Sequence, residues 1–102
     1  MSSYLSKIPT SIDDFKLLPC SRDIADVDFV APGPLEIKAL RNLIGFSQND
    51  LAKFVGVTYN QRKGSTAVRK WETVSGNEAR PISLSAWKLM QIKAGLIVVE
   101  SV

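Results

Sequence analysis

Histidine is absent from this chain, and cysteine occurs once, at Cys20. Without histidine the chain lacks the usual general base and the usual zinc ligand. A single cysteine excludes an intramolecular disulfide and offers no metal cluster. A glycine-rich phosphate loop and a paired nucleophile and base are missing as well. We therefore expect no enzyme activity, no catalytic residues, no metal site and no cofactor.

Long apolar runs are also missing. No apolar stretch approaches the roughly 18 residues of a membrane-spanning helix, and the first eleven residues lack the apolar core of a secretory signal. An intracellular, cytoplasmic protein is the expectation. The 102 residues, 45% of them hydrophobic, suffice for one domain with a small core.

The net charge of +3 is divided unevenly along the chain. Residues 1–33 carry three basic and five acidic side chains, a net charge of −2, whereas residues 53–93 carry eight basic and two acidic ones, a net charge of +6. A basic segment of this kind suits DNA phosphates, although a solvated surface can have the same composition. The aspartates of the first segment are spaced like a capped helix and an acidic strand face, not like a magnesium cluster.

Helix signals recur from residue 34 onward. Pro34 suits a first helical turn, and Gly45 and Gly56 suit helix ends. Ser47 and Asp50 have the spacing of a near capping box. With the apolar periodicity, these signals predict helices over 34–44, 47–55, about 65–74 and about 84–95.

The first 33 residues and the C-terminal tail carry weaker signals. Ser11 is a possible cap for a short helix over 11–18, which Pro19 would stop. Alternation over 25–29 predicts a short strand, and the β-branched tail 96–99 could pair with it or with its own copy. The turn at 31–34 divides an N-terminal extension, 1–33, from a core over 34–97 that is followed by a tail over 98–102.

The helix over 84–95 is apolar on more than one side. One stripe closes a small core, and the second needs a partner, which is either the N-terminal extension or a second subunit. We expect a homodimer on this ground. The stripes are Leu84, Trp87, Met90 and Ala94, and Leu89, Ile92 and Leu96.

The stretch 47–72 carries a family resemblance. The residues that carry it are Leu40, Arg41, Gly45, Ser47, Gln48, Leu51, Ala52, Gly56, Val57, Thr58, Val68, Trp71 and Glu72, with Arg80, Pro81 and Ile82 downstream. As a set they resemble the helix-turn-helix regulators of the phage Cro/C1 (XRE-like) class, over roughly residues 34–95. The resemblance implies a mainly α fold, a four- to five-helix Cro/C1-type domain with a short N-terminal extension, to which the strand signals would add one or two short strands at the termini. One departure is a six-residue insertion over 59–64, where the family has a compact turn.

The resemblance also implies which residues contact DNA. A glutamine at the position of Gln48 binds a phosphate in the family. Arg69 and Lys70 point outward from the third helix, where arginine can bind guanine and lysine can reach bases or phosphates. Ser65 and Thr66 begin that helix, the part that usually enters the major groove, although capping alone could explain Ser65. Lys53 would help to position the protein on the DNA backbone, as Gln48 and the Arg62–Lys63 loop would.

The insertion leaves three interpretations open. Gln61, Arg62 and Lys63 lie on a groove-side loop, or the third helix begins at Thr58 and they form its reading face, or the loop orders only on DNA. A basic loop of this kind is often only solvated and contacts no ligand.

The functional expectation is a dimeric transcriptional repressor or autorepressor on a palindromic operator, which reads the major groove of double-stranded DNA. Two alternatives are an antitoxin, whose acidic extension binds a protein toxin, and a protein-binding adaptor that no longer binds DNA.

Overall fold

The computed structural model describes residues 8–97. Within this range the chain forms five α-helices, one short 3-10 helix and no strand. In chain order these are α2 (Ile12–Phe15), η1 (Pro19–Ser21), α3 (Pro34–Ile44), α4 (Gln48–Val55), α5 (Thr66–Trp71) and α6 (Leu84–Ala94). The expectation of a mainly helical domain is therefore confirmed. Among the described helices, none has the length and apolar character needed to cross a membrane.

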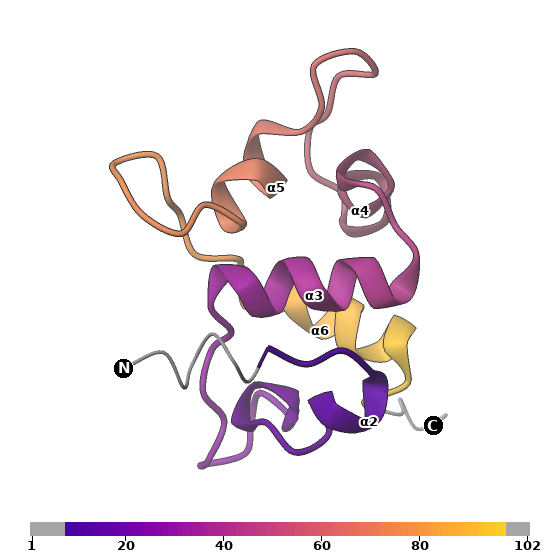
Figure 1. Ribbon diagram of the computed structural model, residues 1–102, viewed down its shortest axis with the longest axis vertical. Helices are drawn as coiled ribbons and strands as arrows, with labels where there is room; N and C mark the ends of the chain where they lie inside the picture. The colour runs from indigo at the N-terminus through magenta and orange to yellow at the C-terminus, as the bar shows by residue number, and fades with distance from the viewer. Residues whose placement is uncertain (1–7, 98–102) are drawn as a thin grey trace.

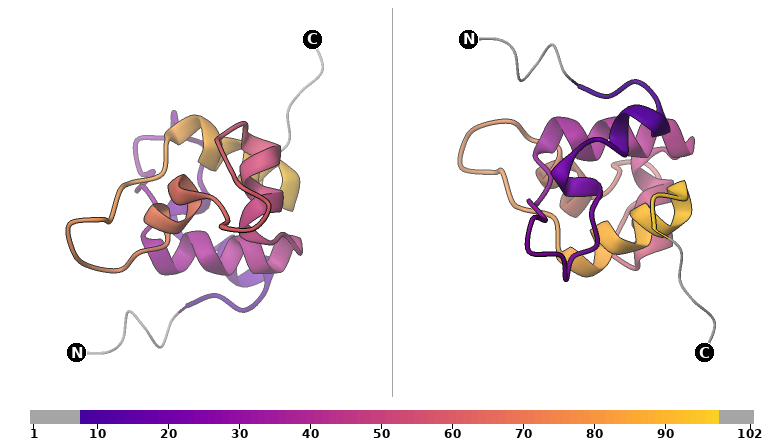
Figure 2. Two further views of the ribbon diagram at one scale, coloured as in Figure 1. Left: turned by 90° about the horizontal axis from the view of Figure 1, so that it is seen from above. Right: turned by 90° about the horizontal axis from the view of Figure 1, so that it is seen from below.

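Helices α3 and α6 form the middle of the molecule, with α6 behind α3 in Figure 1. α4 and α5 lie on one side of this pair, and α2 and η1 lie on the other. The views from above and below in Figure 2 bring each of these groups to the front in turn. α3 packs against α6, and α4 packs against both α5 and α6. The α4–α5 unit consequently forms one end of the molecule.

Every helix contributes to one hydrophobic core. Full burial of a Val, Leu, Ile or Phe side chain stabilises the fold by about 1.5–3 kcal/mol. α4 is held on the body by Leu51 and Ala52, and α5 by Val68 and Trp71. The buried apolar residues are Phe15, Cys20, Ile37, Leu40, Leu51, Ala52, Val68, Trp71, Ile82, Ala86, Trp87 and Met90.

The ends of α3 and α4 lie where the sequence signals predict them. Pro34 is the first residue of α3, and Gly45 ends it with a φ of 90°. Ser47 caps α4: its Oγ accepts a hydrogen bond from Asp50 N at 3.0 Å, and Asp50 Oδ2 accepts one from Ser47 N at 3.0 Å. Gly56 ends α4 with a φ of 85°, in the left-handed region that a side chain disfavours.

Helix α5 is shorter than the predicted 65–74, because other groups bind its last carbonyl groups. Thr73 Oγ1 donates to the carbonyl of Arg69 at 2.8 Å, and Arg80 N donates to the carbonyl of Lys70 at 3.1 Å. These bonds replace the donors that a longer helix would supply, so the chain leaves the helix after Trp71. The predicted helix over 11–18 is also shorter, since only Ile12–Phe15 is α-helical.

The N-terminal segment covers part of α6. Phe15 and Cys20 belong to the shared core. Trp87 Nε1 donates to the carbonyl of Cys20 at 2.8 Å, and Gln91 Nε2 donates to the carbonyls of Cys20 and Arg22, each at 2.9 Å. One apolar side of α6 is therefore covered by this segment, while Leu89 keeps 37% of its surface exposed.

The predicted strand over 25–29 is wrong. The chain there makes consecutive turns: Asp23 Oδ1 accepts from Ala25 N at 2.9 Å, and Asp26 Oδ1 accepts from Asp28 N at 2.8 Å. Aspartate side chains that bind nearby backbone N–H groups favour turns over ladder pairing. Val27, which belongs to the apolar side of the predicted strand, is 96% exposed. Of the predicted tail strand, residues 98–99 lie outside the described range.

Candidate nucleic-acid interface

The α4–α5 unit presents one side to the body and the other to solvent. Val68 and Trp71 face the core, whereas Thr66 and Arg69 are exposed. This division follows from the helical spacing of the apolar residues in α5. Val57, just after the Gly56 turn, packs partly buried against the core. The exposed side of α5 is thus held at a fixed angle to α4.

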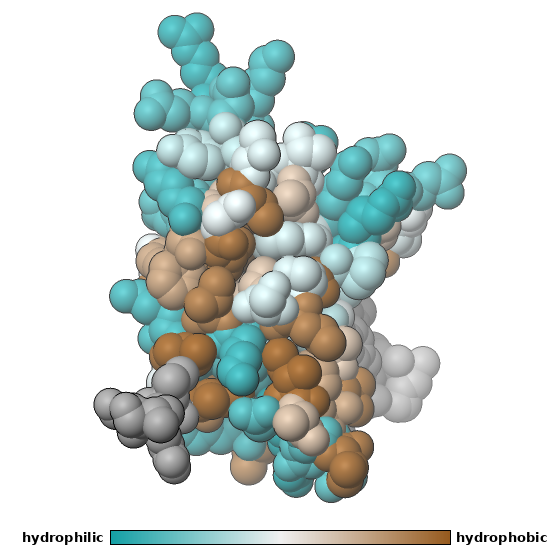
Figure 3. Space-filling model, turned by 180° about the vertical axis from the view of Figure 1, so that it is seen from behind, coloured by the Kyte–Doolittle hydropathy of each residue, from teal (hydrophilic) through white to brown (hydrophobic). Residues whose placement is uncertain are grey.

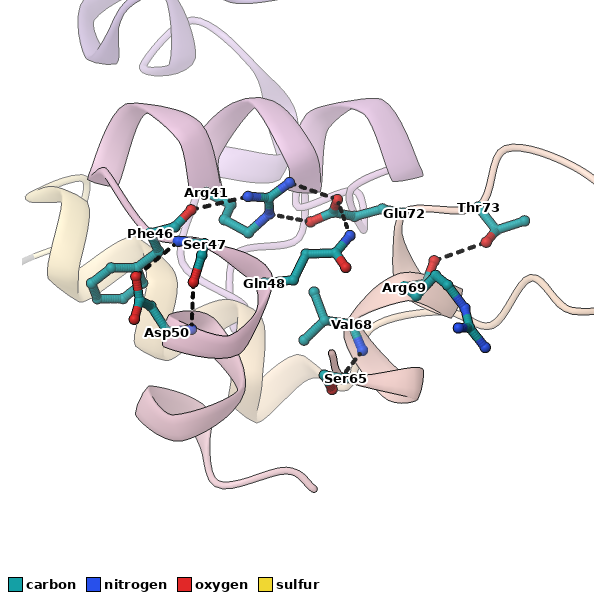
Figure 4. Close-up of polar contacts among 10 residues, drawn as sticks. All are labelled: Arg41, Phe46, Ser47, Gln48, Asp50, Ser65, Val68, Arg69, Glu72 and Thr73. Atoms are coloured by element: carbon teal, nitrogen blue, oxygen red, sulfur yellow. Dashed lines mark hydrogen bonds and ion pairs between the residues drawn. The ribbon is translucent and has the colours of Figure 1, made fainter. Parts of the chain in front are cut away.

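A buried ion pair joins α3 to the end of α5, as Figure 4 shows. Arg41 Nε and Nη2 donate to the Glu72 carboxylate at 2.6 and 2.9 Å, and Arg41 Nη1 donates to the carbonyl of Phe46 at 3.0 Å. The two side chains are 10% and 5% exposed. Gln48 Nε2 also donates to Glu72, at 3.0 Å. Glu72 therefore holds three segments together.

This ion pair was not among the features predicted from the sequence. Arg41 and Glu72 were noted only as residues that match the family. A usable signal was present in the helical spacing. Arg41 lies four residues after the buried Ile37, and Glu72 lies four residues after the buried Val68, so each charged residue shares a helical face with a core residue. Their separation of 31 residues gave no local cue for pairing. The pair forms because the tertiary structure brings the Arg41 side chain of α3 to Glu72 at the C-terminal end of α5.

The segment Tyr59–Gly64 forms a closed loop, which we call the 59–64 hairpin. Asn60 N donates to the carbonyl of Gly64 at 2.8 Å, and Gly64 N donates to the carbonyl of Asn60 at 2.7 Å. Asn60 Oδ1 accepts from the backbone N–H groups of Arg62 and Lys63 at 2.9 and 3.0 Å. Gly64 has a φ of 88°, which suits glycine. These bonds close the loop on itself and leave the side chains of its tip exposed.

Three contacts fix the hairpin to the helices beside it. Asn49 Nδ2, in α4, donates to the carbonyl of Asn60 at 3.1 Å. Ser65 Oγ donates to the carbonyl of Thr58 at 2.8 Å and accepts from Val68 N at 3.3 Å. In addition, the Lys53 ammonium lies 5.4 Å from the centre of the Tyr59 ring.

The candidate residues of the insertion occupy the exposed tip of the hairpin. Gln61, Arg62 and Lys63 are all exposed. Since α5 begins at Thr66, the interpretation that the third helix begins at Thr58 is wrong. The segment is a loop that projects from the molecule (Figure 1), and its place on the groove side of bound DNA stays a prediction.

The remaining candidate residues have different surroundings. Ser65 is 2% exposed and its hydroxyl caps α5, so capping accounts for it. Lys70 Nζ lies 3.8 Å from Glu78 Oε1, on the next loop. The Gln48 amide carries two N–H protons, and the bond to Glu72 uses one of them. Arg69 projects away from the body in Figure 4.

An open groove separates the hairpin from α5. Its volume is about 720 Å³. Lys63 lies on the hairpin wall and Lys70 on the α5 wall, and none of the residues that line it is acidic. The lining residues are Gly56, Val57, Thr58, Tyr59, Asn60, Lys63, Gly64, Thr66, Ala67 and Lys70. The groove therefore suits an anionic ligand.

The two loops that project beside α5 are hydrophilic (Figure 3). Seen from behind, the hairpin and the loop after α5 form the two hydrophilic projections at the top of Figure 3, and apolar residues gather lower on the molecule.

Hydrogen bonds from the backbone and hydroxyl of Ser47 hold the pKa of Asp50 below its usual range, and the charge of Lys53 acts in the same direction. Asp50 is accordingly a charged part of the α4 cap.

Other chemistry finds little support in the described part of the chain. Residues 8–97 contain no group of three or more His, Cys, Asp or Glu side chains placed to hold a metal ion. Burial, with a smaller contribution from the charge of Glu36, raises the pKa of the Cys20 thiol to about 12. At neutral pH this cysteine is an uncharged core residue rather than a nucleophile.

Comparison with known proteins gives no match: no protein-family model, no curated protein and no solved structure matches this chain.

Proposed function

We propose that this protein is a sequence-specific regulator that binds double-stranded DNA through a Cro/C1-type helix-turn-helix, formed by α4, the Gly56 turn and α5. One observation carries the proposal. Val68, Trp71 and the Glu72 ion pair anchor α5 on the body, while Thr66 and Arg69 stay exposed. A short helix fixed in this way, with a polar outer side, is suited to the major groove.

The charges near α5 support a DNA ligand. The α4–hairpin–α5 end of the molecule (Figure 1) carries five basic residues, Lys53, Arg62, Lys63, Arg69 and Lys70. Glu72 is neutralised by Arg41, and Glu78 lies on the loop that follows α5. Phosphates bound by such lysines and arginines release condensed counterions, which provides most of the sequence-independent affinity.

Within this proposal the contacts divide by type. Thr66 and Arg69 read base edges in the major groove, as an arginine can do through guanine O6 and N7. Gln48, Lys53 and Lys70 bind phosphates and set the register. The buried Ser65 belongs to neither group, because its hydroxyl is engaged by the protein.

We also propose that the protein binds as a homodimer. Leu84 and Leu89 on α6 are 46% and 37% exposed, and a second copy could cover them. Two-fold symmetry would place the two α5 helices about 34 Å apart, on a palindromic operator. Occupancy of such an operator near a promoter represses transcription by blocking polymerase.

The test is selection of bound duplexes from a random pool. We expect palindromic winners whose binding falls steeply with salt. Arg69→Ala should weaken the winner by about 1–3 kcal/mol and relax the preference at one position per half-site. Arg22→Ala removes the same charge on the opposite side of the α3–α6 pair and should leave binding unchanged. A pool without winners, or binding that does not respond to salt, would favour the adaptor alternative.

The antitoxin alternative has one observation in its favour. Leu17 and Val27, at the α2 end of the molecule, are 84% and 96% exposed, next to the acidic residues of the N-terminal segment. A basic protein partner would suit such a surface. Purification from the native host should then yield a stoichiometric basic protein, and Val27→Asp should release it without affecting DNA binding.

A further inference from the structure

The groove between the hairpin and α5 has two lysines on opposite walls. Lys63 comes from the hairpin and Lys70 from α5, and three hydroxyl-bearing residues, Thr58, Tyr59 and Thr66, also line the groove. Lysine ammonium groups and hydroxyl groups are typical phosphate ligands in protein–DNA complexes. No acidic residue lines the groove, and the nearest acidic partner of its lysines is Glu78, which is 75% exposed and lies 3.8 Å from Lys70 Nζ. A chain of phosphates can therefore lie along the groove and replace this exposed ion pair at Lys70.

We propose that this groove holds one sugar–phosphate strand of the DNA, so that the hairpin enters the minor groove beside the major groove occupied by α5. The inference rests on the proposed function and adds a second reading element to it. Each backbone strand of a duplex separates the major groove from the minor groove. A protein that grips the strand from both sides must therefore reach into both.

Arg62 is the residue that reads the minor groove in this arrangement. It lies at the exposed tip of the hairpin, two residues after Asn60. A·T-rich minor grooves are narrow and have a strongly negative potential, which attracts an inserted arginine. The G·C pair places an additional amino group on the floor of this groove. Arg62 should accordingly favour A·T pairs at the flank of each half-site.

The hairpin is organised before it meets DNA. The paired bonds between Asn60 and Gly64, and the bond from Asn49 Nδ2, fix its backbone against α4. Asn60 Oδ1 binds the backbone N–H of Arg62, so the position of this residue does not depend on its own side chain. Little conformational entropy is lost when such a loop binds.

The test uses three versions of a selected operator that differ at the flanking position. The pair is A·T, I·C or G·C, where I·C shows the minor-groove face of A·T and the major-groove face of G·C. We expect A·T and I·C to bind within about twofold of each other, and G·C to bind about five- to tenfold more weakly. Arg62→Ala should bind all three equally.

Two controls separate this inference from the proposed function. Arg69→Ala should lower the affinity for all three duplexes but keep their order, and Arg22→Ala should change nothing. If I·C binds as weakly as G·C, or if Arg62→Ala keeps the preference, the minor-groove inference is overturned while the proposed function stands. Failure of the unaltered protein to prefer any duplex in the pool would overturn both.

Discussion

Replacing Glu72 by glutamine is a direct test of how α5 is held. The change keeps the shape of the side chain but removes the charge that faces the Arg41 guanidinium at 2.6 and 2.9 Å. Both partners are at least nine-tenths buried. Removing one partner of a buried pair leaves the other charge without compensation, which costs about 3–5 kcal/mol. Since the amide oxygen can still accept one bond, we expect a loss of about 3 kcal/mol in the free energy of unfolding.

The matched control is Glu78→Gln. Glu78 forms the other ion pair of α5, with Lys70 at 3.8 Å, but it is 75% exposed. An exposed pair contributes between 0 and about 1 kcal/mol. The two variants make the same chemical change, so any difference between them reports the burial and geometry of the Glu72 site.

Urea and thermal unfolding would measure both variants. For a domain of this size about 3 kcal/mol corresponds to a decrease in melting temperature of roughly 12–24 °C. A double variant, Arg41→Met with Glu72→Leu, should recover most of the loss, because apolar residues can replace a buried pair. The reasoning is refuted if Glu72→Gln and Glu78→Gln unfold at the same urea concentration.

Four further outcomes follow from the described structure. At pH 8 the Cys20 thiol should react with an aromatic disulfide reagent at least about a hundredfold more slowly in the native protein than in urea, because its raised pKa leaves almost no thiolate; equal rates would contradict its burial. The pKa of Asp50 is lowered on folding, so its contribution to stability is present above the unfolded pKa of 3.8 and is lost as the pH falls through the lowered value. Asp50→Asn should therefore unfold with a weaker dependence on pH below 4 than the unaltered protein, and parallel curves would refute this. Replacing Arg62 and Lys63 together by alanine should reduce the slope of log affinity against log salt by about 3–4 units per dimer, and an unchanged slope would place the hairpin away from DNA. Sedimentation should give twice the chain mass at micromolar concentration, and Leu89→Asp should give a monomer; a Leu89→Asp dimer would remove α6 from the interface.

Local sequence determined the helices that have strong end signals. Pro34 and Gly45 bound α3 as predicted, and the reciprocal bonds of Ser47 and Asp50 begin α4. These features depend on residues that are close in the chain, so their geometry can be inferred from spacing alone. The inward direction of Val68 and Trp71 follows in the same way from helical periodicity.

Sequence alternation failed over 25–29 for a local reason as well. The pattern of apolar and acidic residues fits a strand, but each aspartate can also bind the backbone N–H two residues later, as Asp23 and Asp26 do. A strand needs a neighbouring strand to satisfy its backbone groups, whereas a turn of this kind satisfies them within the segment. Residues 8–97 contain no strand with which the segment 25–29 could pair.

Tertiary structure alone decided how the segments meet. The N-terminal segment covers α6 through bonds from Trp87 and Gln91 to the carbonyl of Cys20, across 67 and 71 residues. Arg41 reaches Glu72 across 31 residues. Spacing and periodicity describe which side of an element is apolar, but they do not say which element will cover it. That choice depends on the packing of all helices at once, and this packing also sets the angle at which α5 and the hairpin face solvent.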